Sequence, residues 1–195
     1  MNLKQQRRTT SFMAPLLVVI AMGVFQVFNS LGWAGADSEW GVLPRHLDHL
    51  TGILTFHFRH ANWAHYLSNA LPLLILPGIA TTLAPSATKK AWWIIPLVSG
   101  CFVWLIGRNA IHIGASGMVY GWFFFTLGLA LFHRSWAGLV AAILAFMFFG
   151  GLVWVFAGGD TVSWEGHLGG AIAGLLAARV TKQAAKATQQ EKPIV

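Results

Sequence analysis

Six long apolar stretches are the feature that most constrains how this chain can fold. Each approaches the length of about 20 residues that a helix needs to cross the hydrocarbon core of a membrane. Only 10% of the residues are charged, against about 25% in an ordinary soluble domain, so the chain lacks the polar surface to face water all round. Because helices satisfy their backbone hydrogen bonds internally, the sequence predicts an all-α, polytopic membrane protein with a six-helix transmembrane bundle. The expected spans cover residues 12–31, 63–84, 91–107, 115–132, 135–157 and 162–180.

The basic residues predict the orientation of this bundle. If the N-terminus is cytoplasmic, only Arg45, Arg59 and Arg108 of the 13 Lys and Arg residues lie outside, which is the positive-inside pattern. The net charge of +7 is then explained by topology and by attraction to anionic lipid, not by nucleic-acid binding. Five of the six acidic residues also fall outside in this arrangement, namely Asp37, Glu39, Asp48, Asp160 and Glu165.

The chain is expected to form one domain. We expect a cytoplasmic basic N-terminus over residues 1–11, a membrane domain over 12–181 and a cytoplasmic tail over 182–195, with a long first outer loop from Gly32 to about Asn62. The basic start, the first apolar run and the Ala34-Gly35-Ala36 sequence also fit a signal peptide with its cleavage site. The length of the apolar run favours a retained first helix. Cys101 is the single cysteine, so no intramolecular disulfide is possible.

Few polar side chains lie within the expected spans, and they gather at one depth. His65 and Asn69 lie four residues apart on one face of the second span, Ser116 opens the fourth, and His167 lies near the start of the sixth. These three spans all run from outside to inside, so the polar groups enter the membrane from the same side. Each group lies within the first one or two helical turns, or roughly 3–10 Å below the outer boundary.

This set of residues supports one particular chemistry. Taken singly, Ser116 is more often a packing or capping residue, His167 an interfacial histidine and Asn69 a polar link between helices. Taken together, Ser116 can act as a nucleophile once His167 accepts its proton. N–H groups of His65, Asn69 and the Ser116 backbone can hold a developing oxyanion. No carboxylate is expected in a span at that depth, so the sequence predicts a Ser-His dyad.

Three motifs, in order, resemble those of the rhomboid intramembrane serine proteases. They are His65-x-x-x-Asn69, Gly114-Ala115-Ser116-Gly117 and Gly166-His167-Leu168-Gly169-Gly170, and each opens an even-numbered span. The run from Gly41 to Leu74 is also similar to the bacterial members, and the resemblance covers nearly the whole chain.

The resemblance implies a function as well as a fold. It implies a six-helix bundle with a water-filled cavity open to the outer side, a Ser116 nucleophile, a His167 base and an oxyanion site at His65, Asn69 and the Ser116 amide. Tyr120 matches the family's aromatic residue that packs on the catalytic histidine. The implied substrates are membrane proteins cut in or near a transmembrane helix, and the implied location is the bacterial cytoplasmic membrane with both termini inside.

Glycines are expected to serve both the site and the packing. Gly114 and Gly117 would leave room for a substrate backbone beside Ser116. Small residues at four-residue spacing let helices approach closely, which predicts contact between the fourth and sixth spans. The residues in this pattern are Gly117, Gly121, Gly166, Gly170 and Gly174.

Three other interpretations of the sequence compete with the protease: a metal site, a binder of transmembrane proteins and a transporter. The first-loop histidines His46, His49, His57 and His60 have no carboxylate or thiolate at a fixed spacing, so packing is favoured over a metal site, and no metal or cofactor is expected. The expected partners are transmembrane protein substrates and the lipid bilayer. A non-enzymatic binder of transmembrane clients on the same scaffold is the alternative. A transporter using His65 and His167 as a proton relay fits poorly, since the cavity would open to one side only.

Overall fold

The computed structural model describes residues 12–33, 35, 40–134, 136–150 and 162–190, with side chains up to residue 182. These residues form the helices α2 (Met13–Ser30), α4 (Gly52–Thr55), α5 (Trp63–Leu83), α6 (Pro85–Ile106), α7 (Ser116–His133), α8 (Trp136–Phe149) and α9 (Trp164–Gln190). Two short 3₁₀ helices, η1 (Leu47–His49) and η2 (Phe56–Phe58), lie in the first loop. The predicted all-α architecture is confirmed.

Four of the expected spans are long apolar helices, α2, α5, α6 and α7, each long and apolar enough to cross a membrane. For the fifth span, α8 covers 14 residues, and residues 151–161 lie outside the described part of the chain. The sixth begins at Trp164 and its helix continues to Gln190, beyond the predicted start of the tail at residue 182. The predicted N-terminal segment 1–11 lies outside the described residues.

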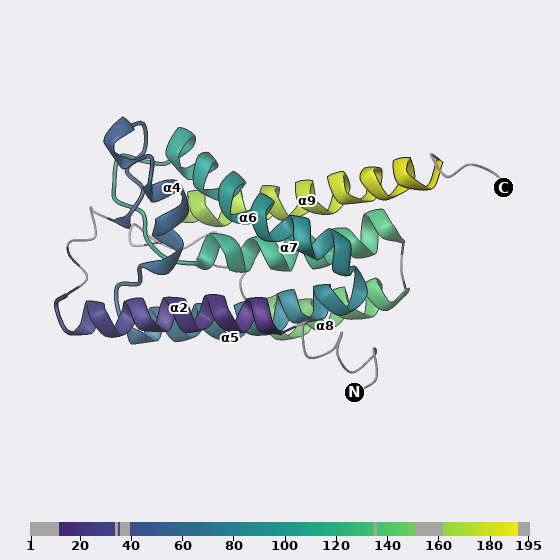
Figure 1. The fold of residues 1–195 in the computed structure, drawn as a ribbon, viewed down its shortest axis with the longest axis horizontal. Coiled ribbons are helices and arrows are strands. Elements are labelled where there is room, and N and C mark those ends of the chain that lie inside the picture. Colours follow the sequence, from purple (N-terminus) through teal and green to yellow (C-terminus); the bar gives the residue numbers. More distant parts are fainter. Residues whose placement is uncertain (1–11, 34, 36–39, 135, 151–161, 191–195) are drawn as a thin grey trace.

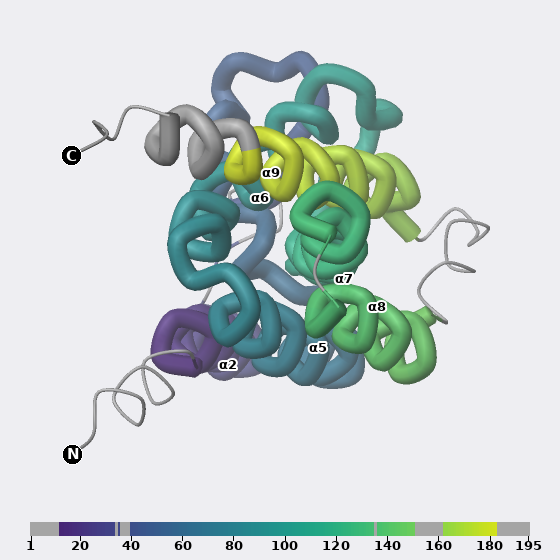
Figure 2. Tube along the Cα trace, turned by 90° about the vertical axis from the view of Figure 1, so that its right-hand side faces the viewer, coloured from purple at the N-terminus to yellow at the C-terminus, as the bar shows by residue number. Residues whose placement is uncertain are grey.

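Helix α7 is the centre of the bundle. In the end-on view it lies between α9 above and α8 below, with α5 and α6 to its left, and it contacts all four helices (Figure 2). Of its apolar window 61% is buried inside the protein, against 17–44% for the other three candidate spans. Large side chains such as Trp122, Phe123 and Phe125 are almost fully buried around it. The outer helix α2 packs on α5, where the Tyr66 hydroxyl donates to the Val19 carbonyl at 3.2 Å.

The first loop folds against the end of α6. The Trp104 indole N–H donates to the His46 carbonyl at 3.0 Å, and the Arg45 guanidinium donates to the Gly107 carbonyl at 2.7 Å. The second bond satisfies a carbonyl at the C-terminus of α6, where helices leave acceptors without a partner. The loop and the first turns of α5, α7 and α9 therefore lie at the same end of the molecule (Figure 1).

Glycines bring α7 and α9 into backbone contact, as predicted. A Cβ atom at Gly170 would collide with the Gly117 carbonyl, and one at Gly174 would collide with the Gly121 carbonyl. A Cβ at Gly117 would lie 3.1 Å from the Gly166 carbonyl oxygen. This close approach fixes the start of α9 beside the start of α7.

The substitution Gly170→Ala is expected to destabilise the bundle. Its methyl group would meet backbone atoms of α7, which cannot move without separating the two helices. Overpacking of this kind costs about 1–3 kcal/mol, and the thermal midpoint in detergent measures it. The matched control is Gly150→Ala, whose Cβ would have as its nearest neighbours ring atoms of Phe146 at 3.5 Å or more. Equal midpoints for the two variants would contradict the packing.

Candidate active site

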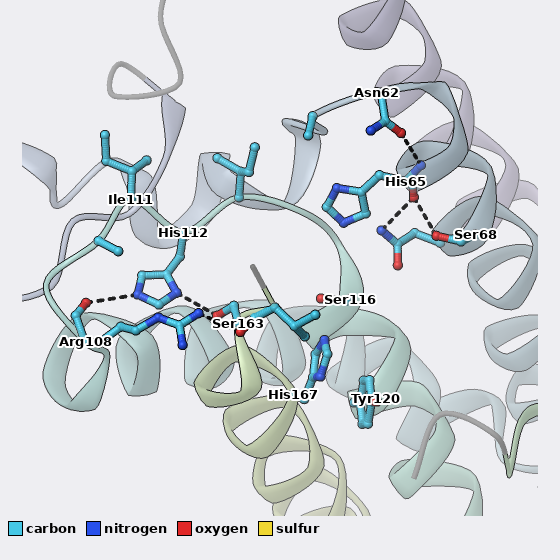
Figure 3. Close-up of a pocket in the computed structure, with 15 residues that line it drawn as sticks. Asn62, His65, Ser68, Arg108, Ile111, His112, Ser116, Tyr120, Ser163 and His167 are labelled. Carbon is cyan, nitrogen blue, oxygen red and sulfur yellow. Dashed lines mark hydrogen bonds between the residues drawn. The ribbon is translucent and has the colours of Figure 1, made fainter. Parts of the chain in front are cut away.

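One cavity collects the polar residues predicted from the spans. It has a volume of about 630 Å³ and lies where α5, α7 and α9 begin. Ser116, Tyr120, His167 and His65 line it (Figure 3). Asn69 lines it as well. The N-terminus of a helix carries partial positive charge, so three helix starts at one cavity favour negative charge there. The site therefore suits a reaction that develops an oxyanion.

The turn before Ser116 is set by Gly114. Its φ is +112°, a conformation that side chains rarely adopt, and a Cβ there would lie 2.7 Å from two atoms of the His65 ring. The Gly114 N–H donates to the Phe56 carbonyl at 2.8 Å. Ser116 follows as the first residue of α7, so its backbone N–H is one of those that a helix leaves without an internal partner.

His60 supports this turn from the first loop. Its Nε2 accepts a hydrogen bond from the Ala115 N–H at 3.3 Å, one residue before Ser116. Burial lowers the pKa of His60 to about 3, and the nearby His65 adds to the effect. The ring therefore stays neutral near pH 7, and Nε2 keeps the lone pair that the Ala115 N–H needs.

His167 lies in the first turn of α9 and stacks on Tyr120. The two ring centroids are 4.2 Å apart and the planes differ by 11°. His167 is 4% exposed, and its backbone N–H donates to the Ser163 carbonyl at 3.2 Å. The stacked ring of Tyr120 limits the orientations that the imidazole can adopt.

The predicted oxyanion residues lie on the opposite wall of the cavity, on α5. The Asn69 amide donates to the His65 carbonyl at 3.1 Å, which holds the side chain against its own helix. Asn62 caps α5 by accepting from the His65 N–H at 2.9 Å. Gly117 is not among the cavity-lining residues and faces α9 instead, where its nearest neighbour is the Gly166 carbonyl.

The first-loop histidines separate into two groups. His46 and His49 each lie 3.9 Å from the exposed carboxylate of Asp48. His57 is buried, with Nε2 at 3.2 Å from the Pro96 carbonyl oxygen, and His60 lies beneath the Ser116 turn. Within the described residues, no group of three or more His, Cys, Asp and Glu side chains has metal-binding geometry.

The expectation that no carboxylate lies at the depth of the site is wrong. Glu165 is in the first turn of α9 and only 1% exposed. Its Oε1 accepts from the Arg108 backbone N–H at 3.2 Å and lies 3.8 Å from Arg108 Nε. The predicted topology places Glu165 on the outer side, and in the structure its contacts with Arg108 allow the carboxylate to be buried.

The cavity-lining residues that were not predicted as site residues include three with polar side chains, Arg108, His112 and Ser163, which come from the connections around the site. They lie directly before α9 or in the segment between α6 and α7, where apolar periodicity gives no signal. The one available signal was the position of His112, four residues before Ser116.

The family is decided by comparison with known proteins. Residues 47–184 match the model of the Rhomboid domain. The chain belongs to the rhomboid family. It is 36% identical over 173 residues to uncharacterized proteins of Mycobacterium tuberculosis and Mycobacterium bovis, covering 84% of this chain and 72% of theirs. It is 35% identical over 182 residues to an uncharacterized protein of Mycobacterium leprae, covering 86% of this chain and 68% of that one.

Membership of the rhomboid family fits the apolar helices and gives an integral membrane protein. The matched region begins in the first loop, at Leu47, and includes α5 to α9 up to residue 184. All the cavity-lining residues therefore lie within the rhomboid domain.

Acid is expected to destabilise this rhomboid domain through two buried first-loop histidines. Burial lowers the pKa of His57 to about 4 and that of His60 to about 3, below the value of 6.5 in an unfolded chain. The unfolded state therefore binds more protons, and the stability that neutral histidines contribute is complete above pH 6.5 and is lost as the pH falls toward those values. Each group lowers the free energy of unfolding by about 1.4 kcal/mol per pH unit in that window.

Thermal midpoints measured from about pH 7.5 to about pH 4.5 test this expectation. Replacing the exposed Ser86, whose side chain does not titrate, by alanine should leave the pH dependence unchanged. A midpoint that stays constant across the range would show that His57 and His60 are not held neutral.

Proposed function

We propose that this rhomboid-family protein is an intramembrane serine endopeptidase that uses a Ser116-His167 dyad. The observation that carries the proposal is the shared cavity. Ser116 from α7, His167 from α9 and the two α5 residues His65 and Asn69 line one space at the helix starts. This is the arrangement that acyl transfer needs: a hydroxyl, a base and donors for an oxyanion.

The reaction would proceed in two stages. His167 accepts the Ser116 hydroxyl proton as Oγ attacks the substrate carbonyl carbon, and the carbonyl oxygen takes up the negative charge. The C–N bond then breaks, the amine leaves with the proton from His167, and an ester remains on Ser116. Water attacks this ester while His167 again accepts a proton, which releases the acid and restores the hydroxyl.

The substrates would be membrane proteins with a locally weak transmembrane helix. A peptide bond inside a helix is shielded by its own hydrogen bonds, so the segment must unwind before Ser116 can attack. Glycine lowers the cost of unwinding by about 1 kcal/mol and proline by about 3 kcal/mol. Segments that carry such residues near the outer leaflet are therefore the expected sites of cleavage.

The orientation follows from the charges at the helix ends. Lys89 and Lys90 lie in the first turns of α6 and Arg134 follows the end of α7, at the end of the bundle away from the cavity. The positive-inside rule then places these residues in the cytoplasm and the cavity toward the outer side. In a bacterium this location is the cytoplasmic membrane, with both termini inside.

Cleavage of a transmembrane reporter in liposomes tests the proposal. The wild-type chain should cut the reporter, and Ser116→Ala should not. The matched control is Ser86→Ala, at an exposed position of α6 remote from the cavity, and it should cut like the wild type. A reporter that binds the wild type and Ser116→Ala equally but is never cut would favour a non-enzymatic binder.

A further inference from the structure

The loop that leads to Ser116 is tied directly to the helix that carries His167. His112, four residues before Ser116, is 3% exposed, and its ring contacts Ser163 before α9 and Arg108 after α6. Its Nδ1 lies 2.6 Å from the Ser163 hydroxyl oxygen, and its Nε2 lies 3.1 Å from the Arg108 carbonyl oxygen (Figure 3). Its backbone pairs with Val42 of the first loop through two hydrogen bonds of 3.0 Å.

The chemistry of the partners fixes the direction of these bonds. The Arg108 carbonyl can only accept, so Nε2 of His112 carries the proton. Burial lowers the pKa of His112, which favours the neutral ring and leaves Nδ1 as an acceptor. The Ser163 hydroxyl therefore donates to Nδ1, and its oxygen accepts from the Gly166 N–H at 3.2 Å. One chain of hydrogen bonds thus runs from the first turn of α9 to the end of α6.

A second set of hydrogen bonds connects the segment after α6 with the start of α9. Glu165 accepts from the Arg108 backbone N–H at 3.2 Å, and the Arg108 guanidinium donates to the Val162 carbonyl at 2.6 Å. The start of α9 is thereby held at Val162, Ser163 and Glu165, just before His167. The nucleophile and the base lie on different helices, so their separation depends on contacts of this kind.

We propose that His112 and Ser163 are positioning residues whose hydrogen bond sets the place of His167 relative to Ser116. The proposal rests on the proposed function, since it assigns these residues to the same dyad. Neither residue exchanges a proton with the substrate. Their effect is geometric, and a displacement of about 1 Å at reacting groups can lower a rate by roughly 10²-fold.

Kinetics of variants at both positions distinguish positioning from general structural support. His112→Ala and Ser163→Ala should each lower kcat by about 10- to 100-fold with KM changed less than about twofold. The kcat of the double variant should be no lower than that of the less active single variant, because both substitutions remove the same hydrogen bond. Ser163→Thr keeps the hydroxyl and His112→Asn keeps an acceptor near the Nδ1 position, so both should recover most of the rate. His46→Ala, at a half-exposed histidine away from the cavity, is the matched control.

Hydrogen exchange provides a readout that does not require activity. The amides of Gly166 and His167, which donate to Ser163, should exchange faster in His112→Ala than in the wild type. Faster exchange together with lower kcat and recovery by His112→Asn is the expected result. Unchanged exchange rates in His112→Ala would show that the His112–Ser163 hydrogen bond does not hold the start of α9. Faster exchange with a normal kcat would show that this bond does not position His167 for catalysis. A wild-type protein that neither cleaves the reporter nor reacts at Ser116 would overturn the proposed function and the catalytic part of this proposal. The exchange rates would still decide whether the His112–Ser163 hydrogen bond holds the start of α9.

Discussion

Replacing His167 by alanine is expected to lower reporter cleavage by at least about 10³-fold while leaving the bundle folded. The Ser116 hydroxyl is a weak nucleophile until a base accepts its proton, and losses in serine proteases that lack the histidine reach about 10⁶-fold in kcat. The imidazole stacks on Tyr120 but carries none of the α7–α9 backbone contacts, which lie at the glycines. The measurement is kcat in liposomes beside the helical circular dichroism of the same sample.

Two comparisons make the His167 result specific. The variant His133→Ala removes a half-buried histidine at the far end of α7, where Nε2 lies 3.1 Å from the Ala178 carbonyl, and it should keep its activity. His167→Ala should also keep its affinity for the reporter, because the base is needed for chemistry and not for docking. Cleavage by His167→Ala at the wild-type rate would exclude the dyad.

Loss of the oxyanion donors is expected to have the second largest effect. His65→Ala and Asn69→Ala should each lower kcat by about 10²–10³-fold, the range found when one oxyanion donor is removed. Both residues line the cavity from α5, and the first turns of α5 hold them in place. The loss should appear in kcat more than in KM, since the charge on the oxygen develops only in the transition state.

An exposed apolar position on the same helix supplies the control for the oxyanion variants. Leu67 is 59% exposed on α5 between His65 and Asn69, and Leu67→Ala should leave kcat unchanged. A normal kcat in both His65→Ala and Asn69→Ala would mean that the α5 wall does not hold the oxyanion. The Ser116 amide and the start of α7 would then be left as its only proposed donors.

Four of the six expected spans are confirmed as long apolar helices, and they could be predicted from the sequence because membrane thickness dictates their length. The first was expected at 12–31 and is Met13–Ser30, and the second was expected at 63–84 and is Trp63–Leu83. The contact of α7 with α9 was also predictable, since glycines at four-residue spacing mark a face that another helix can approach. The sequence also predicted that the polar residues of α5, α7 and α9 lie together, because each is near the start of a span and these three spans run in the same direction.

The connections between spans could not be predicted in the same way. His112, Arg108 and Ser163 acquire their places from hydrogen bonds to segments about 50 residues apart in the chain, and no local pattern encodes such pairs. Glu165 was predicted on the outer side, and the fold brings Arg108 to it, so that the buried carboxylate has a hydrogen-bond partner. Similarly, the bond of His60 to the Ala115 amide depends on a loop that has neither helical nor strand periodicity.

Covalent labelling of Ser116 by a fluorophosphonate tests the central claim most directly. The reagent reacts with a serine that a neighbouring base has activated and needs no knowledge of the substrate. The account predicts labelling of the wild-type chain at Ser116, identified by peptide mass spectrometry, and its loss in both Ser116→Ala and His167→Ala. Labelling that persists in His167→Ala, or that falls on a serine other than Ser116, would contradict the dyad.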